Sequence, residues 1–163
     1  MEKKEIISEF IEYSSADELP EEERELILLA GNAAKDAYAP YSNFNVGAAV
    51  LMSNGKIITA NNQENAAYPS GLCAERIAVF SAVAQNPGIK IKSIAIIATS
   101  QNVNIDKPVS PCGACRQVIA EYEILYKSEI KILMSGNTGK VFGTNSIKNL
   151  LPLLFNSSSL KNE

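Results

Sequence analysis

Apolar positions in the first part of the chain change from a helical to a strand-like spacing. Residues 2–13 resemble a short amphipathic helix, and over 21–37 the apolar side chains recur three and four residues apart, which predicts a helix with one buried face. Pro20 stands where that helix would open. Two β-prone runs then flank Asn54 and Gly55, and this pattern predicts a β-hairpin closed by a type I′ turn.

The remainder of the chain alternates between helices and strands. Helical spacing resumes at Cys73, and the continuous apolar run SIAIIAT that follows is typical of a buried strand. Another helix should begin near Cys112 and lead into the strand IKILMS, after which KVF would add a short strand and SIKNLLPLLF a last helix. This alternation favours parallel pairing, so we expect an α/β fold: a three-layer α/β/α sandwich around a mixed sheet of about five strands.

Length and charge restrict the number of domains and the class of partner. With 163 residues, 46% of them hydrophobic, the chain predicts one domain over 1–163, with a helix at about 2–13 and a flexible tail at about 156–163. The net charge of -3 argues against a nucleic-acid partner, and no apolar run approaches the roughly 20 residues that span a membrane. We therefore expect a cytoplasmic protein that acts on a small molecule.

The cysteines point toward metal chemistry. The chain has three cysteines and no histidine, so a Ser-His or Cys-His catalytic pair is excluded and the cysteines cannot all pair within one chain. Cys112 and Cys115, just after Pro111, would lie on one face of a first helical turn. Cys73 opens a second predicted helix, whose positive end also favours a thiolate. Three thiolates with an open fourth position are typical of catalytic zinc, while a redox dithiol and inert buried cysteines are the alternatives.

Charged residues beside the cysteines have candidate roles. Arg76, three residues after Cys73, is placed to donate hydrogen bonds to thiolate sulfur and to offset the negative charge of a three-thiolate centre. Arg116, next to Cys115, could do the same, although an exposed salt bridge is the more ordinary expectation. Glu75 can share a site with Cys73 only if Cys73 occupies the N-cap of its helix. Otherwise Glu75 would simply complement the helix dipole.

Four motifs, taken in order, resemble the zinc-dependent cytidine deaminases. YSNFNVGAAV is similar to the first strand of that family, NQENAAYPSGLCAER to its ribose-binding and metal segment, PCGACRQV to its second metal segment and LLPLLF to its C-terminal motif. The likeness covers about residues 20–155, which leaves the predicted N-terminal helix outside it. It is closest to the small homotetrameric class with three cysteine ligands, and it implies the cytidine deaminase fold with one zinc ion per subunit.

The resemblance also implies the catalytic roles of matching residues. Cys73, Cys112 and Cys115 would bind zinc, and Arg76 would support their thiolates. Glu75 would transfer protons during the hydrolytic deamination of cytidine to uridine and ammonia, with 2′-deoxycytidine as a second expected substrate.

Substrate-binding roles follow from the same resemblance. Asn62 and Glu64 would bind the ribose hydroxyls, and Phe44 would lie against the nucleoside. Tyr68 would lie at a subunit interface, and Phe155 would stack on the pyrimidine in the site of a neighbouring subunit. The family would therefore imply a homotetramer with shared active sites, working in pyrimidine salvage in the cytoplasm.

Other functions are compatible with parts of the sequence. A thiol-disulfide oxidoreductase would use Cys112 and Cys115 without metal, and would exchange two electrons. A zinc-bearing interaction module would need a fourth protein ligand, which the sequence does not clearly provide. A deaminase of a related nucleoside or of a nucleoside antibiotic would share the chemistry and differ in its substrate.

Overall fold

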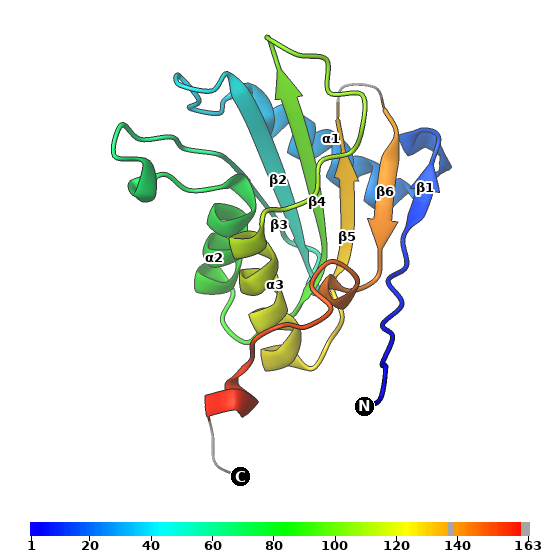
Figure 1. Cartoon of the computed structure of the whole chain (residues 1–163). Helices are drawn as coiled ribbons and strands as arrows, with labels where there is room; N and C mark the ends of the chain where they lie inside the picture. Colours follow the sequence, from blue (N-terminus) through cyan, green and yellow to red (C-terminus); the bar gives the residue numbers. More distant parts are fainter. Residues whose placement is uncertain (137–138, 161–163) are drawn as a thin grey trace.

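The computed structural model describes residues 1–136 and 139–160, and a six-stranded mixed sheet forms its centre (Figure 1). The strands are β1 (Ile11–Tyr13), β2 (Phe44–Met52), β3 (Ile57–Asn61), β4 (Ile91–Ser100), β5 (Lys131–Ser135) and β6 (Val141–Thr144). Their order across the sheet is β1-β6-β5-β4-β2-β3. Strands β4 and β5 are parallel, and every other neighbouring pair is antiparallel.

Helices cover both faces of the sheet. Helix α1 (Glu21–Lys35) lies on one face, and α2 (Ala74–Gln85) and α3 (Gly113–Tyr126) lie side by side on the other (Figure 1). The predicted three-layer sandwich is confirmed, with six strands in place of about five. The predicted parallel pairing holds only for β4 and β5. Strands β3 and β4 run in the same direction, since both are antiparallel to β2, but β2 lies between them.

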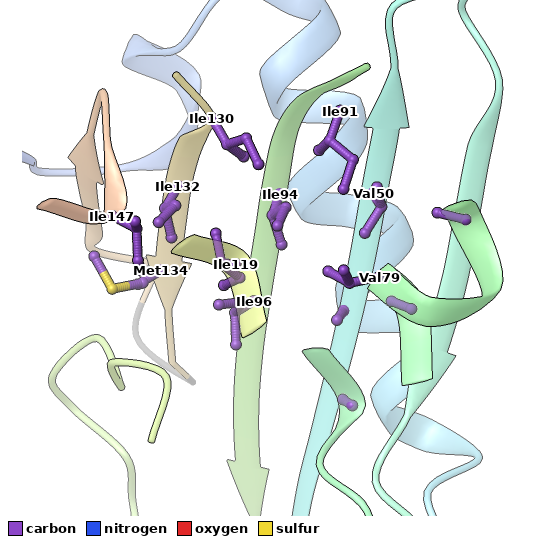
Figure 2. Packing of buried hydrophobic residues seen from close by; sticks show 14 of the residues in the cluster. Val50, Val79, Ile91, Ile94, Ile96, Ile119, Ile130, Ile132, Met134 and Ile147 are labelled. Atoms are coloured by element: carbon purple, nitrogen blue, oxygen red, sulfur yellow. The ribbon is translucent and has the colours of Figure 1, made fainter. Parts of the chain in front are cut away.

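Successive residues of the central strands pack against opposite helical layers. One core lies beneath α2 and α3 and includes Val50, Ile94, Ile96, Ile132 and Met134 together with helical residues such as Val79 and Ile119 (Figure 2). The intervening residues Ala49, Leu51, Ala95, Ile97 and Leu133 pack against α1. Because both faces of these strands are covered, the sequence SIAIIAT shows a continuous apolar run and no alternation.

Helix α1 approaches β2 closely at Gly47. A Cβ atom at this position would lie 1.9 Å from the Ala30 carbonyl oxygen and 2.5 Å from the Ala34 nitrogen, both of which are backbone atoms. Only glycine therefore allows the helix to reach this distance from the sheet. The contact lies near the beginning of β2, which starts at Phe44.

Strands β2 and β3 form the predicted hairpin, but its turn is not type I′. The Met52 N–H donates to the Lys56 carbonyl at 2.9 Å, which leaves a three-residue loop, and within that loop only Gly55 has a positive φ, of 83°. A type I′ turn requires positive φ at both central residues. The Asn54 side chain instead accepts a hydrogen bond from the Lys56 N–H at 3.1 Å, and this local bond stabilises the three-residue form.

The predicted N-terminal helix is wrong. Residues 1–10 have no regular secondary structure, and the next three form β1 against the edge of β6. The rings of Phe10 and Phe142 lie 4.9 Å apart, and Glu12 pairs with Lys140 at 2.8 Å. The edge of β6 offers unpaired backbone groups, and pairing with them outweighs the weak helical tendency of so short a segment.

The predicted last helix is reduced to a single turn, η3 (Ile147–Asn149). Pro152 lacks a backbone N–H and disfavours helical geometry at the preceding residue, so the helix cannot continue through this segment. Three further short turns are η1 (Ala16–Glu18), η2 (Tyr68–Ser70) and η4 (Ser157–Leu160). Flexibility of the tail stays a prediction, because residues 161–163 lie outside the described part of the chain. Within the described part, no helix is both long and apolar enough to cross a membrane.

Candidate metal centre and active site

The three cysteines meet at the N-termini of two neighbouring helices. Cys73 is the N-cap of α2, Cys112 is the N-cap of α3, and Cys115 lies in the first turn of α3. The Sγ atoms of Cys73 and Cys112 are 3.8 Å apart, and those of Cys112 and Cys115 are 3.4 Å apart. All three sulfur atoms lie within 4.8 Å of one another. The fold therefore brings together residues that the sequence separates by about forty positions.

This donor set fits a zinc ion. A tetrahedral centre with Zn–S bonds of about 2.3 Å has sulfur atoms about 3.8 Å apart, close to the observed separations. Cys115 is buried, Cys73 is partly buried and Cys112 is exposed, so the cluster opens toward solvent on one side. Among the described cysteine and acidic residues, these three sulfurs are the group whose donor atoms converge. Three protein ligands leave a fourth position for water or substrate, as in catalytic zinc sites.

Hydrogen bonds within the cluster favour a thiolate at Cys73. The hydrogen bond with the Cys115 thiol, and next the Arg76 guanidinium, lower the pKa of Cys73 to about 5. Nη2 of Arg76 donates to the Cys73 sulfur at 3.6 Å, as its position three residues along α2 predicts. The same interaction with Cys73, together with burial, raises the pKa of Cys115, because its proton is shared with the neighbouring sulfur. Zinc would replace that proton as the positive charge between the sulfurs.

Glu75 lies in the first turn of α2, beside the cluster. The sequence predicts that Glu75 can share a site with Cys73 only if Cys73 is the N-cap of the helix. Cys73 does occupy the N-cap, and Glu75 lines the same cavity as Cys73 and Cys112. Glu75 is only 5% exposed. Burial raises the pKa of its carboxyl group, so it accepts a proton more readily than an exposed glutamate does.

An open cavity of about 740 Å³ extends from the cluster to the loops at the end of the sheet. This volume is within the range of small-molecule sites. The cavity gathers eight of the ten residues predicted for the site: Phe44, Asn62, Glu64, Tyr68, Cys73, Glu75, Arg76 and Cys112. Cys115 is buried and is not part of the lining, and Phe155 lies outside the lining of its own chain. Phe155 is 57% exposed.

Asn62 and Glu64 are fixed by the strand and loop that face them. The Asn62 side chain accepts a hydrogen bond from the Val46 N–H at 2.7 Å and donates one to the Phe44 carbonyl at 3.0 Å. One amide N–H of Asn62 is left over from this pair, since the side chain carries two donors. The side chain is thus held against β2 at the rim of the cavity.

Sequence reasoning missed the residue that holds Glu64. The Ser42 hydroxyl donates to the Glu64 carboxylate at 2.5 Å, and the backbone N–H groups of Tyr41 and Ser42 donate to it at 2.9 and 3.3 Å. The Ser42 hydroxyl, followed by these backbone groups, lowers the pKa of Glu64. The sequence does contain this serine, within the motif YSNF, but the motif by itself indicates only the start of a strand. Glu64 is therefore an ionised acceptor with a fixed direction.

Comparison with known proteins gives a consistent result. Residues 20–127 match the family model described as the cytidine and deoxycytidylate deaminase zinc-binding region. A cytidine deaminase of Sporosarcina psychrophila is 40% identical over 136 residues, which are 83% of this chain and 92% of that protein. One from Halalkalibacterium halodurans is 38% identical over 135 residues, 83% of this chain and 95% of that one.

Two further relatives bear on structure and substrate. The crystal structure of a cytidine deaminase from Burkholderia pseudomallei superposes with a TM-score of 0.70 at 41% identity, covering 80% of this chain and 97% of that chain. A blasticidin-S deaminase of Bacillus cereus is 34% identical over 113 residues, 68% of this chain and 76% of that protein.

Proposed function

The chain belongs to the cytidine and deoxycytidylate deaminase family, and from this membership we propose that it converts cytidine and 2′-deoxycytidine to uridine and 2′-deoxyuridine by hydrolysis, with release of ammonia. The observation that carries the proposal is the buried Glu75 beside the three-cysteine cluster on one cavity. A redox dithiol would need neither this carboxyl group nor a third sulfur at the same point.

The residues of the chain divide the reaction between them. Cys73, Cys112 and Cys115 hold zinc, which when bound supplies Lewis-acid activation for the attack of water on C4 of the pyrimidine. Glu75 accepts a proton from the attacking water, delivers a proton to N3 of the ring and assists the departure of the amino group as ammonia. Its buried position suits this shuttle, because burial raises the pKa of the carboxyl group and makes it a better proton acceptor than an exposed glutamate.

Charges around the cavity favour a free nucleoside over a nucleotide. The charged residues among its described lining are Glu64, Glu75 and Arg76, and the Arg76 guanidinium already donates to a cysteine sulfur. A phosphate on the ribose would therefore lie nearest the Glu64 carboxylate, while the single cation of the described lining is bonded to Cys73. Asn62 and Glu64 bind the ribose hydroxyls through the remaining amide N–H and the fixed carboxylate, and Phe44 lies against the nucleoside.

A panel of aminopyrimidine substrates tests this proposal. The zinc-loaded protein should deaminate cytidine and 2′-deoxycytidine, measured by the ultraviolet absorbance change and by ammonia release, and should leave cytidine 5′-monophosphate unchanged. Blasticidin S belongs in the panel because of the similar blasticidin-S deaminase. If only blasticidin S is turned over, it and not cytidine is the substrate. If only the monophosphate is turned over, the inference that the charges of the cavity disfavour a nucleotide is wrong.

The site is completed by other copies of the chain. Tyr68 lines the cavity yet is 76% exposed, and the exposed ring of Phe155 and side chain of Leu153 lie on the C-terminal segment. A homotetramer would cover these residues, with Tyr68 at the interface and Phe155 stacked on the pyrimidine in a neighbouring site. The reduced thiols and the nucleoside substrate fit a cytoplasmic enzyme of pyrimidine salvage.

Mixing two impaired variants tests whether Phe155 acts in a neighbouring site. Phe155→Ala should lose roughly 1–3 kcal/mol of stacking on the base, and so raise KM for cytidine while zinc stays bound. Co-refolding Phe155→Ala with Glu75→Gln creates sites that combine an intact Glu75 with an intact Phe155 from another subunit. Activity of the mixture should exceed the sum of the separate variants.

The matched control for this mixture is Glu64→Gln with Glu75→Gln. Both residues line the cavity of one chain, so exchange of subunits cannot restore a complete site, and the control mixture should show no recovery. If the mixture with Phe155→Ala behaves like the control although the subunits have exchanged, Phe155 does not act across an interface.

A further inference from the structure

Arg116 makes two hydrogen bonds that its sequence position does not predict. The residue follows Cys115 in the first turn of α3 and is partly buried, so the expected exposed salt bridge is wrong. Its Nε donates to the Pro111 carbonyl at 2.7 Å, and its Nη1 donates to the Leu150 carbonyl at 2.7 Å. One planar guanidinium group therefore holds two backbone segments that lie 39 positions apart in the sequence.

The first of these carbonyl groups precedes a candidate zinc ligand. Pro111 is bonded directly to Cys112, so the hydrogen bond from Arg116 fixes the peptide plane from which the Cys112 backbone starts. Cys112 has no hydrogen bond from its own side chain to the helix backbone at the N-cap, and it is the exposed member of the three cysteines. Its sulfur contacts the sulfurs of Cys73 and Cys115, and the place from which its side chain reaches them is set by the backbone on either side. On one side that backbone is α3 itself, and on the other it is the Pro111 carbonyl held by Arg116.

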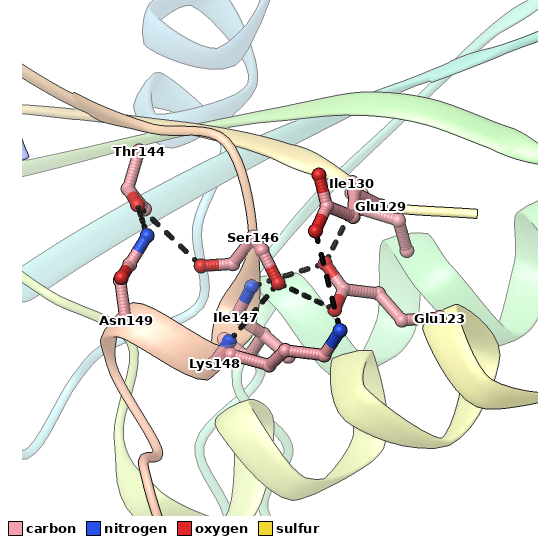
Figure 3. A network of polar contacts seen from close by, with 8 residues as sticks. All are labelled: Glu123, Glu129, Ile130, Thr144, Ser146, Ile147, Lys148 and Asn149. Atoms are coloured by element: carbon pink, nitrogen blue, oxygen red, sulfur yellow. Dashed lines mark hydrogen bonds and ion pairs between the residues drawn. The ribbon is translucent and has the colours of Figure 1, made fainter. Parts of the chain in front are cut away.

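The second carbonyl group belongs to a segment that α3 holds at both ends. Glu123 lies seven residues after Arg116, two helical turns along the same face. Its carboxylate accepts hydrogen bonds from the Ile147 N–H at 3.0 Å and from the Ser146 hydroxyl at 2.8 Å (Figure 3). The carboxylate thus takes the N–H end of η3, and Arg116 takes the Leu150 carbonyl at its other end. The hydrogen bond to the Leu150 carbonyl therefore anchors the Arg116 guanidinium group.

We propose that Arg116 is a positioning residue of the zinc centre, which holds the Cys112 thiolate in place through the Pro111 carbonyl. The Leu150 carbonyl anchors the guanidinium group, so the geometry of the metal loop is set by a side chain that touches neither zinc nor substrate. The inference rests on zinc binding within the proposed function, and it does not depend on which nucleoside is deaminated.

The test is the rate at which the folded, zinc-loaded protein gives up its metal to a chromogenic chelator. Arg116→Gln should release zinc at least about tenfold faster than the unchanged protein, the lower end of the effect seen when outer partners of metal ligands are removed. Arg116→Lys should fall between the two, because one ammonium group cannot reproduce the planar fork that serves both carbonyls.

Ser146→Ala and Glu123→Gln are the matched controls. Both loosen the far end of the same segment and leave the two hydrogen bonds of Arg116 in place, so they should lower the thermal unfolding temperature with less effect on zinc release than Arg116→Lys. If Glu123→Gln does not fold, Ser146→Ala alone is the control.

Two outcomes would overturn the inference. One is zinc release from Arg116→Gln at the rate of the unchanged protein. The other is a release rate that follows the unfolding temperature equally in all four variants, which would make Arg116 only a structural residue. An unchanged protein that binds no zinc would instead reject the proposed function, so the two failures are distinguishable.

Discussion

Glu75→Gln is expected to lower kcat for cytidine by roughly 10²–10⁴-fold, the usual contribution of a positioned acid-base group, while zinc stays bound. Glutamine has almost the same size and can occupy the same buried place in α2, but it cannot accept the proton of the attacking water. The loss should appear in kcat and less in KM, because the substitution leaves unchanged Asn62 and Glu64, for which we propose ribose binding.

Steady-state kinetics on protein of known zinc content measure this effect. Glu121→Gln is the matched control, since Glu121 is an exposed glutamate on α3 and should tolerate the change without loss of activity. Near-normal turnover by Glu75→Gln with full zinc would show that another group transfers the protons.

Cys112→Ala should abolish zinc binding and, with it, deamination. A metal ligand is removed, so activity should fall by more than the roughly 10–100-fold that follows loss of a ligand's outer partner. Cys112 suits the test because its side chain is exposed, and the substitution therefore leaves no cavity in the core. Zinc binding contributes to folding free energy, so the unfolding temperature should also fall toward that of the metal-free protein.

Metal analysis after dialysis, together with thermal unfolding in the presence and absence of a chelator, checks this result. The unchanged protein should lose stability when the chelator is added, and the Cys112→Ala protein should not respond. Retention of stoichiometric zinc by Cys112→Ala would remove Cys112 from the ligand set and leave the cluster to be reassigned.

The parts of the fold that local sequence determines could be predicted. Helices α1, α2 and α3 and the hairpin of β2 and β3 follow from apolar spacing, and the N-cap positions of Cys73 and Cys112 place two candidate ligands without any knowledge of the sheet. What failed depends on distant partners. The first segment becomes β1 because β6, about 130 residues later, offers it an edge, as the pairing of Glu12 with Lys140 illustrates.

The site divides in the same way. The cysteines and Glu75 carry their chemistry in their residue types and spacing, so sequence was sufficient to bring them together as candidates. The roles of Ser42 and Arg116 depend on contacts with distant residues. The serine donates a hydrogen bond to a carboxylate 22 positions away, and the arginine donates one to a carbonyl 34 positions away. Nothing in a serine within a turn, or in an arginine after a cysteine, indicates which partner the fold will bring to it.

Zinc-dependent turnover tests the central claim most directly. Protein stripped of metal by a chelator should leave cytidine unchanged, and stepwise return of zinc should restore ammonia release in proportion, reaching its maximum at one zinc per chain. Full deamination by the metal-free protein, or a zinc-loaded protein that leaves cytidine untouched, would contradict the assignment of the three-cysteine cluster and Glu75 as the catalytic centre.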